Sequence, residues 1–116
     1  MQNYKKLKVW EVAHKLTISV YKMTQLFPKE EIYGLTSQLR RAMASIPANI
    51  SEGCGRNTQA DFSRFLTIAL GSANETSYFP LLAKDVGYLS EENFEIYENE
   101  IEKIKAMLIS LIAKTK

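Results

Sequence analysis

The chain has 116 residues, 46% of them hydrophobic and 24% charged, a composition that fits one globular domain and excludes a disordered chain. Its net charge of +2 is unevenly distributed, because residues 1–29 hold six lysines and one glutamate whereas residues 90–116 are acidic overall. With Cys54 as the only cysteine, no membrane-span-length apolar segment and no apolar signal segment, we expect no disulfide, no membrane insertion, no export and a cytoplasmic location.

The first half of the chain predicts two helices, because apolar residues recur there at three- and four-residue spacing. One helix is expected at about 4–27, where Pro28 ends it. The second is expected at about 30–53 and ends at a glycine-rich turn that begins with Gly53. Pro47 lies inside the second helix, where we expect a kink, with a break as the alternative.

The second half predicts two more helices. One is expected at about 58–87, with Thr58 as its N-cap and Pro80 in its interior, and the other at about 90–114, with Ser90 as its N-cap. Short connections between long amphipathic helices make consecutive helices antiparallel. The expected fold is therefore a single all-α domain over residues 1–116, an antiparallel up-down-up-down four-helix bundle.

Residues suited to catalysis or metal binding are few. Glu11 and His14 form half of a di-iron Glu-x-x-His pattern, but His14 is the only histidine, so the second half cannot come from the same chain. A nucleophilic pair of Cys54 with His14 has no supporting motif. We expect no catalytic residue, no cofactor, no metal site and no small-molecule substrate, and we interpret His14 as a structural residue.

Small and polar residues are expected to meet between the second and third helices. Folding these helices as a hairpin about residue 56 places Arg40 opposite Ser72 and Ser45 opposite Thr67. One hypothesis is a charge-assisted pair between Glu75 and a neighbouring arginine. For the seam as a whole, packing that fixes the helix register is a simpler interpretation than a ligand site. The expected polar seam consists of Arg40, Arg41, Asn49, Ser72 and Glu75.

Several basic residues are candidates for phosphate contacts, because we expect them to be exposed near chain ends or bundle ends. They could form a basic stripe for an anionic partner, although lysines on a solvated helix face are the commoner explanation. The candidate nucleic-acid-binding residues are Lys5, Lys6, Lys8, Arg56 and Arg64.

Three segments of the sequence resemble the corresponding segments of a known protein family. They are Gly34-Leu-Thr-Ser-Gln-Leu-Arg-Arg-Ala, Ser45-Ile-Pro-Ala-Asn-Ile-Ser-Glu-Gly, and Phe65-Leu with Gly71-Ser72 and Glu75. Together they resemble the 23S rRNA intervening sequence proteins, which are bacterial four-helix bundles, and the resemblance extends from about Tyr4 to Leu111. Pro80 departs from the apolar run expected at that point of the third helix.

The resemblance implies a ring-like homopentamer and kinship with the accessory proteins of diversity-generating retroelements, which are basic pentamers that engage nucleic acid. It supplies no catalytic residue. The expected function is that of a non-enzymatic homo-oligomer that binds rRNA or other nucleic acid through a basic surface assembled from several copies. The alternative is a protein–protein adaptor or scaffold with no nucleic-acid role.

Overall fold

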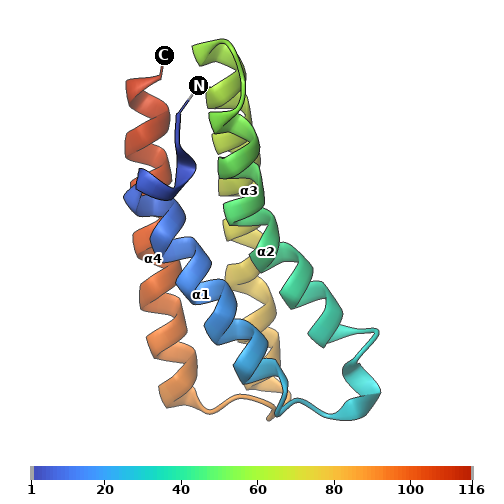
Figure 1. Cartoon of the computed structure of the whole chain (residues 1–116). Coiled ribbons are helices and arrows are strands. Elements are labelled where there is room, and N and C mark those ends of the chain that lie inside the picture. The colour runs from blue at the N-terminus through green and yellow to red at the C-terminus, as the bar shows by residue number, and fades with distance from the viewer. Residues whose placement is uncertain (1, 116) are drawn as a thin grey trace.

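The computed structural model describes residues 2–115, which contain four α-helices and two short 3-10 helices. Consecutive α-helices run in opposite directions, and the N- and C-termini lie at the same end (Figure 1). The described residues form no strand, so the fold is all-α and consists of four helices. The elements are η1 (Tyr4–Lys6), α1 (Lys8–Thr24), η2 (Lys29–Glu31), α2 (Leu35–Cys54), α3 (Gln59–Asp85) and α4 (Glu91–Lys114).

The first two predicted helices are each divided in the structure. Leu7 has extended backbone angles (φ −82°, ψ 126°) and separates η1 from α1, and the Asn3 side chain caps η1 by accepting a hydrogen bond from the Lys5 amide. Gly34, with φ −115° and ψ −115°, lies between η2 and α2 without being extended. An α-helix leaves its first amides unpaired, and Glu31 of η2 supplies an acceptor for the first amide of α2.

The carboxylate of Glu31 joins two connections at the end of the bundle far from the termini. One oxygen accepts a hydrogen bond from the amide of Leu35 at 3.0 Å, and the other accepts one from the hydroxyl of Tyr88 at 3.0 Å. Tyr88 lies in the turn between α3 and α4 and packs against Phe27. This carboxylate therefore ties the α1–α2 connection to the α3–α4 turn.

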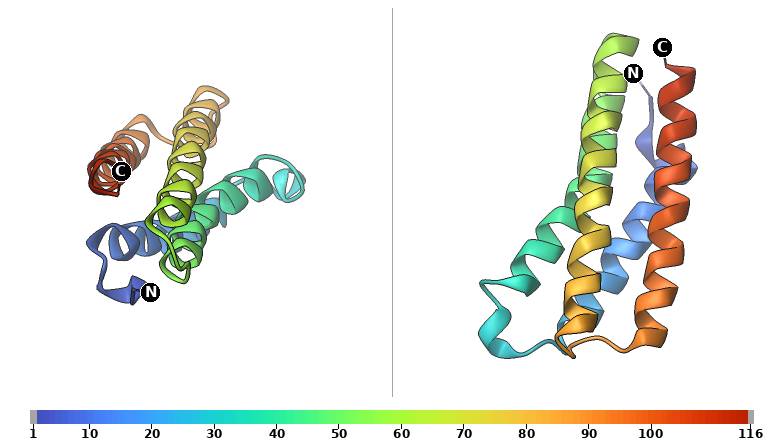
Figure 2. Two further views of the ribbon diagram at one scale, coloured as in Figure 1. Left: turned by 90° about the horizontal axis from the view of Figure 1, so that it is seen from above. Right: turned by 180° about the vertical axis from the view of Figure 1, so that it is seen from behind.

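Neither internal proline ends its helix. Pro47 lies inside α2 and Pro80 inside α3, and both rings are buried. The N-terminal half of α2 diverges from α3, while its C-terminal half runs beside α3 (Figures 1 and 2). Each proline removes one backbone donor, but its ring adds to the buried apolar surface that holds the helix in place.

The core is built from one apolar stripe of each helix, as the three- and four-residue spacing predicts. No helix in residues 2–115 is long and apolar enough to cross a membrane. Burying each large aliphatic side chain of the core contributes roughly 1.5–3 kcal/mol to the stability of the folded state. The largest fully buried aliphatic side chains are Val20, Leu39, Met43, Ile46, Ile50, Leu66, Ile101, Ile104 and Leu108.

The end of α2 packs tightly against the start of α3. A Cβ atom added to Gly53 would lie 2.9 Å from the Cβ of Phe65 and 3.1 Å from Cδ1 of Phe62. Two Cβ atoms essentially never come this close in real structures, so only glycine at position 53 lets the two backbones pack at this distance. The contact fixes the geometry of the α2–α3 turn and of the arginines around it.

Candidate functional site

Two arginines share one aromatic ring at the α2–α3 turn. The guanidinium carbons of Arg56 and Arg64 lie 4.8 Å and 4.6 Å from the centre of the Phe65 ring. Both arginines are exposed, and their ion pairs with Glu52 and Asp61 are long, at 3.5 Å and 3.9 Å. The ring restricts where the guanidinium planes can lie while leaving N–H donors facing solvent.

The N-terminal segment lies at the same end of the bundle. The amide of Gln2 donates a hydrogen bond of 3.0 Å to the carbonyl oxygen of Cys54, the last residue of α2. Lys5 and Lys6 are exposed on η1, which continues from this contact. Because Glu52 and Asp61 offset the two arginines, the excess positive charge of this end comes from the two lysines.

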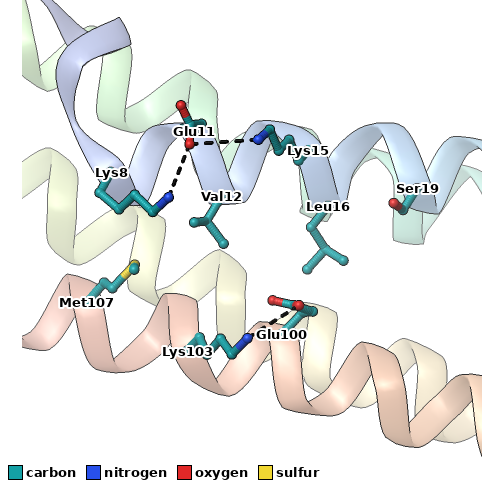
Figure 3. A pocket seen from close by; sticks show the side chains of 9 residues that line it. All are labelled: Lys8, Glu11, Val12, Lys15, Leu16, Ser19, Glu100, Lys103 and Met107. Carbon is teal, nitrogen blue, oxygen red and sulfur yellow. Dashed lines mark hydrogen bonds and ion pairs between the residues drawn. The ribbon is translucent and has the colours of Figure 1, made fainter.

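Lys8 belongs to a different surface. Its ammonium group pairs with Glu11 at 3.2 Å, and Lys15 approaches the same carboxylate oxygen at 3.8 Å. These side chains line a groove between α1 and α4, with Val12 on its floor (Figure 3). Lys8 and Lys15 lower the pKa of Glu11, first through the hydrogen bond from Lys8. The groove was not among the sites expected from the sequence.

The centre of the predicted polar seam is a hydrogen-bonded cluster between α2 and α3. The hydroxyl oxygens of Ser45 and Ser72 lie 2.9 Å apart, and the amide group of Asn49 donates to the carbonyl and hydroxyl oxygens of Ser45 at 2.8 Å and 2.9 Å. Ser45 therefore meets Ser72 rather than Thr67. Side chains lean toward the N-terminus of their own helix, which shifts antiparallel pairs in this direction.

Arg40 is not part of this seam. Its Nε atom donates a 2.7 Å hydrogen bond to Oγ1 of Thr24, and Nη2 donates to the carbonyl oxygen of Tyr21 at 3.2 Å. The guanidinium also lies 4.8 Å from the centre of the Tyr21 ring. Arg40 thus binds the C-terminal turn of α1, where a cation complements both the unpaired carbonyls and the helix dipole. Its contacts tie α1 to α2.

Arg41 and Glu75 line one polar depression of about 460 Å³ between α2 and α3, with the hydroxyls of Ser45 and Ser72 beside them. Within residues 2–115 no ion pair shorter than 4.0 Å joins Glu75 to an arginine. The structure therefore does not form the pair hypothesised between Glu75 and Arg40 or Arg41. Both Arg41 and Glu75 are exposed, and water separates such charges at little energetic cost.

The remaining reactive residues have structural surroundings. His14 is exposed, and its ring stacks on Trp10 at 4.9 Å between ring centres. Cys54 is buried, and burial raises the pKa of its thiol, which disfavours the nucleophilic thiolate. In the part of the chain that the structure describes, no three histidine, cysteine or acidic residues lie close enough to hold a metal ion.

Comparison with known proteins agrees with this architecture. The family model described as 23S rRNA-intervening sequence protein matches residues 5–110. A crystal structure of a protein of unknown function from the S23 ribosomal protein family of Bacteroides thetaiotaomicron is 30% identical. The match covers 90% of this chain and 95% of that chain, with a TM-score of 0.83. No curated protein matches the chain. Because the family model spans nearly all of the described helices, the chain belongs to the 23S rRNA-intervening sequence protein family.

Proposed function

We propose that this protein is a non-enzymatic homo-oligomer, a pentamer, that binds structured rRNA or other nucleic acid through its basic end. The observation that carries the proposal is the pair Arg56 and Arg64 on the single ring of Phe65. A guanidinium held against an aromatic ring loses less freedom when it binds, and its planar donors match phosphate oxygens. Lys5 and Lys6, at the same end, add charge without a fixed geometry.

Oligomerisation supports binding through repetition. One chain carries a net charge of only +2, which gives a weak attraction for a polyanion. Several copies that present the same basic end to one nucleic acid act together, because each later contact forms at high effective concentration. The surroundings of Cys54 and His14 favour this binding role over catalysis.

The experiment is a salt series of fluorescence anisotropy titrations with a labelled fragment of 23S rRNA. The wild-type protein is compared with the double variant Arg56→Gln and Arg64→Gln, and with Lys29→Gln as a control outside the basic end. Each lost phosphate contact should reduce the slope of log affinity against log salt by about 0.7–0.9. Sedimentation velocity of the same samples gives the number of copies.

The proposal predicts a shallower salt slope for the arginine variant and an unchanged slope for the control. Absence of binding by the wild-type protein at low salt would refute the nucleic-acid role. A double variant that binds with the wild-type slope would show that Arg56 and Arg64 make no phosphate contact.

A further inference from the structure

The helices α1 and α4 leave a groove between them. These two helices contact each other much less than α1 contacts α2 or α3 contacts α4. One depression of about 480 Å³ and another of about 410 Å³ lie along them. Lys8 and Met107 line both depressions, so the two are consecutive parts of one surface, here named the α1–α4 groove.

The groove has an apolar floor. Figure 3 shows the side chains of Val12, Leu16 and Met107 between the two helices, and Leu111 continues this floor toward the C-terminus. Val12, Met107 and Leu111 are only partly buried in the chain. An added apolar surface would remove them from water, at about 25 cal/mol per Å² of apolar area.

The rims of the groove are basic. Four lysines face two glutamates, so the lining carries two excess positive charges. Glu11 lies between two lysines, and Glu100 pairs with Lys103 at 3.5 Å (Figure 3). Both carboxylates therefore already have lysine partners, and the surplus charge is available to a ligand. The lysines of the lining are Lys8, Lys15, Lys103 and Lys114.

The dimensions of the groove fit a helix. Its lining runs from Leu7, the N-cap of α1, to Ser19 of α1, which at about 1.5 Å per residue corresponds to roughly 18 Å. A partner helix of about 12–14 residues would span it. An amphipathic helix presents one apolar stripe flanked by polar residues, which is the complement of an apolar floor between charged rims.

Two other occupants fit less well. The lysines of the rims could contact phosphates, but the groove lining offers no aromatic ring on which the bases of a single-stranded nucleic acid would stack. A second copy of this chain could offer the acidic start of α4, but the exposed large apolar residues of that helix are Ile96 and Ile109, which lie 13 residues apart. Those two do not form a continuous stripe.

We propose that the α1–α4 groove binds an amphipathic helix of another protein, with its apolar stripe on Val12, Leu16 and Met107 and its acidic flanks against Lys15 and Lys103. The groove begins at Leu7, directly after Lys6 of the basic end, but its lining contains neither Arg56 nor Arg64, so the interaction does not require those two arginines. The partner is defined by its chemistry, which is three to four helical turns with an apolar face and carboxylates on both sides of it.

The test uses a fluorescein-labelled synthetic peptide of about 14 residues, stapled as a helix on its outer face. Leucines at three- and four-residue spacing form its apolar stripe, and glutamates flank the stripe. A matched peptide carries lysines in place of the glutamates. The protein variants are Lys15→Glu with Lys103→Glu for the rims, Val12→Glu for the floor and Lys29→Glu as a control outside the groove. Circular dichroism confirms that each variant is folded.

The glutamate peptide should bind the wild-type protein and the Lys29→Glu control equally. The rim variant should weaken this binding about tenfold, which corresponds to about 1.4 kcal/mol, and should bind the lysine peptide better than the wild-type protein does. Val12→Glu should weaken both peptides.

Four results would overturn the proposal. They are no binding of the glutamate peptide to the wild-type protein, binding that neither the rim variant nor the floor variant changes, displacement of the peptide by an rRNA fragment, and loss of self-association in the rim variant by sedimentation velocity. The last result would assign the groove to a second copy of the chain.

Discussion

Substitution of Gly53 by alanine tests the close contact between α2 and α3. The added methyl group would lie 2.9 Å from the Cβ of Phe65, and this atom cannot move away by a change of side-chain rotamer because it is fixed to the backbone. The helices would have to separate by several tenths of an ångström, which disturbs the packing of Phe62 and the α2–α3 turn. Gly53→Ala should therefore destabilise the fold.

The magnitude is set by two opposing effects. Inserting a methyl group into a filled core costs about 1–3 kcal/mol, whereas replacing glycine in a helix interior gains at most about 1 kcal/mol, and less this near the helix end. The expected net loss is about 1–2 kcal/mol. For a domain of this size about 4 °C corresponds to 1 kcal/mol, so Tm should fall by about 4–8 °C.

Gly71 provides the matched control. It lies in the interior of α3, it is exposed, and a Cβ atom there would meet no atom within 4 Å. Gly71→Ala makes the same chemical change without a clash and should stabilise the chain by about 0.5–1 kcal/mol. Urea unfolding followed by circular dichroism measures both variants, at one protein concentration because any association of copies would add stability.

The comparison separates steric contact from helix propensity. A Gly53→Ala variant as stable as the wild-type protein would show that the α2–α3 contact relaxes without cost, which contradicts the packing argument. Equal destabilisation by Gly53→Ala and Gly71→Ala would show that the effect has nothing to do with Phe65.

Three further substitutions test other parts of the fold by urea unfolding. Thr58→Ala removes the hydroxyl that accepts a 3.1 Å hydrogen bond from the amide of Asp61, and it should cost about 1 kcal/mol, whereas Thr58→Ser should cost less. Leu66→Ala creates a cavity at a fully buried site and should cost about 2–5 kcal/mol; a loss below 1 kcal/mol would contradict the core assignment. Burial raises the pKa of Tyr97 above its ordinary value of 10.0, so the unfolded chain loses this proton first and stability should fall as the pH rises above about 10. Tyr97→Phe also removes the contact of the hydroxyl with Met43, so the variant should be less stable than the wild-type protein at pH 8. Between pH 8 and 11 it should lose less stability than the wild-type protein. An equal loss in both proteins would refute the contribution of Tyr97 ionisation.

The helices and two of their caps follow from local patterns in the sequence. Thr58 and Ser90 accept hydrogen bonds from amides three residues later, as their positions before the apolar runs predict. The breaks at Leu7 and Gly34 carry no comparable local signal. No side chain caps α1 at Leu7. At the second break the carboxylate of Glu31 accepts a hydrogen bond from the amide of Leu35, and this carboxylate is itself held by Tyr88 from another part of the chain.

Which side chains meet at the candidate sites was less predictable, because this depends on how the helices are placed relative to one another. Arg56 lies in the α2–α3 turn, and Arg64 and Phe65 lie near the start of α3, so all three are close in sequence and the exposure of the arginines at one end could be anticipated. Arg40 contacts α1, and this depends on the angle between α1 and α2, which apolar spacing does not determine. The α1–α4 groove depends in the same way on how far the first and last helices separate.

The two hydrogen bonds that the carboxylate of Glu31 accepts affect how the bundle opens. Since the carboxylate holds both the Leu35 amide and the Tyr88 hydroxyl, neither connection at the end far from the termini can detach without weakening the other. Backbone amides in the two connections should therefore exchange with deuterium as one cooperative unit, although more than 50 residues of chain separate them.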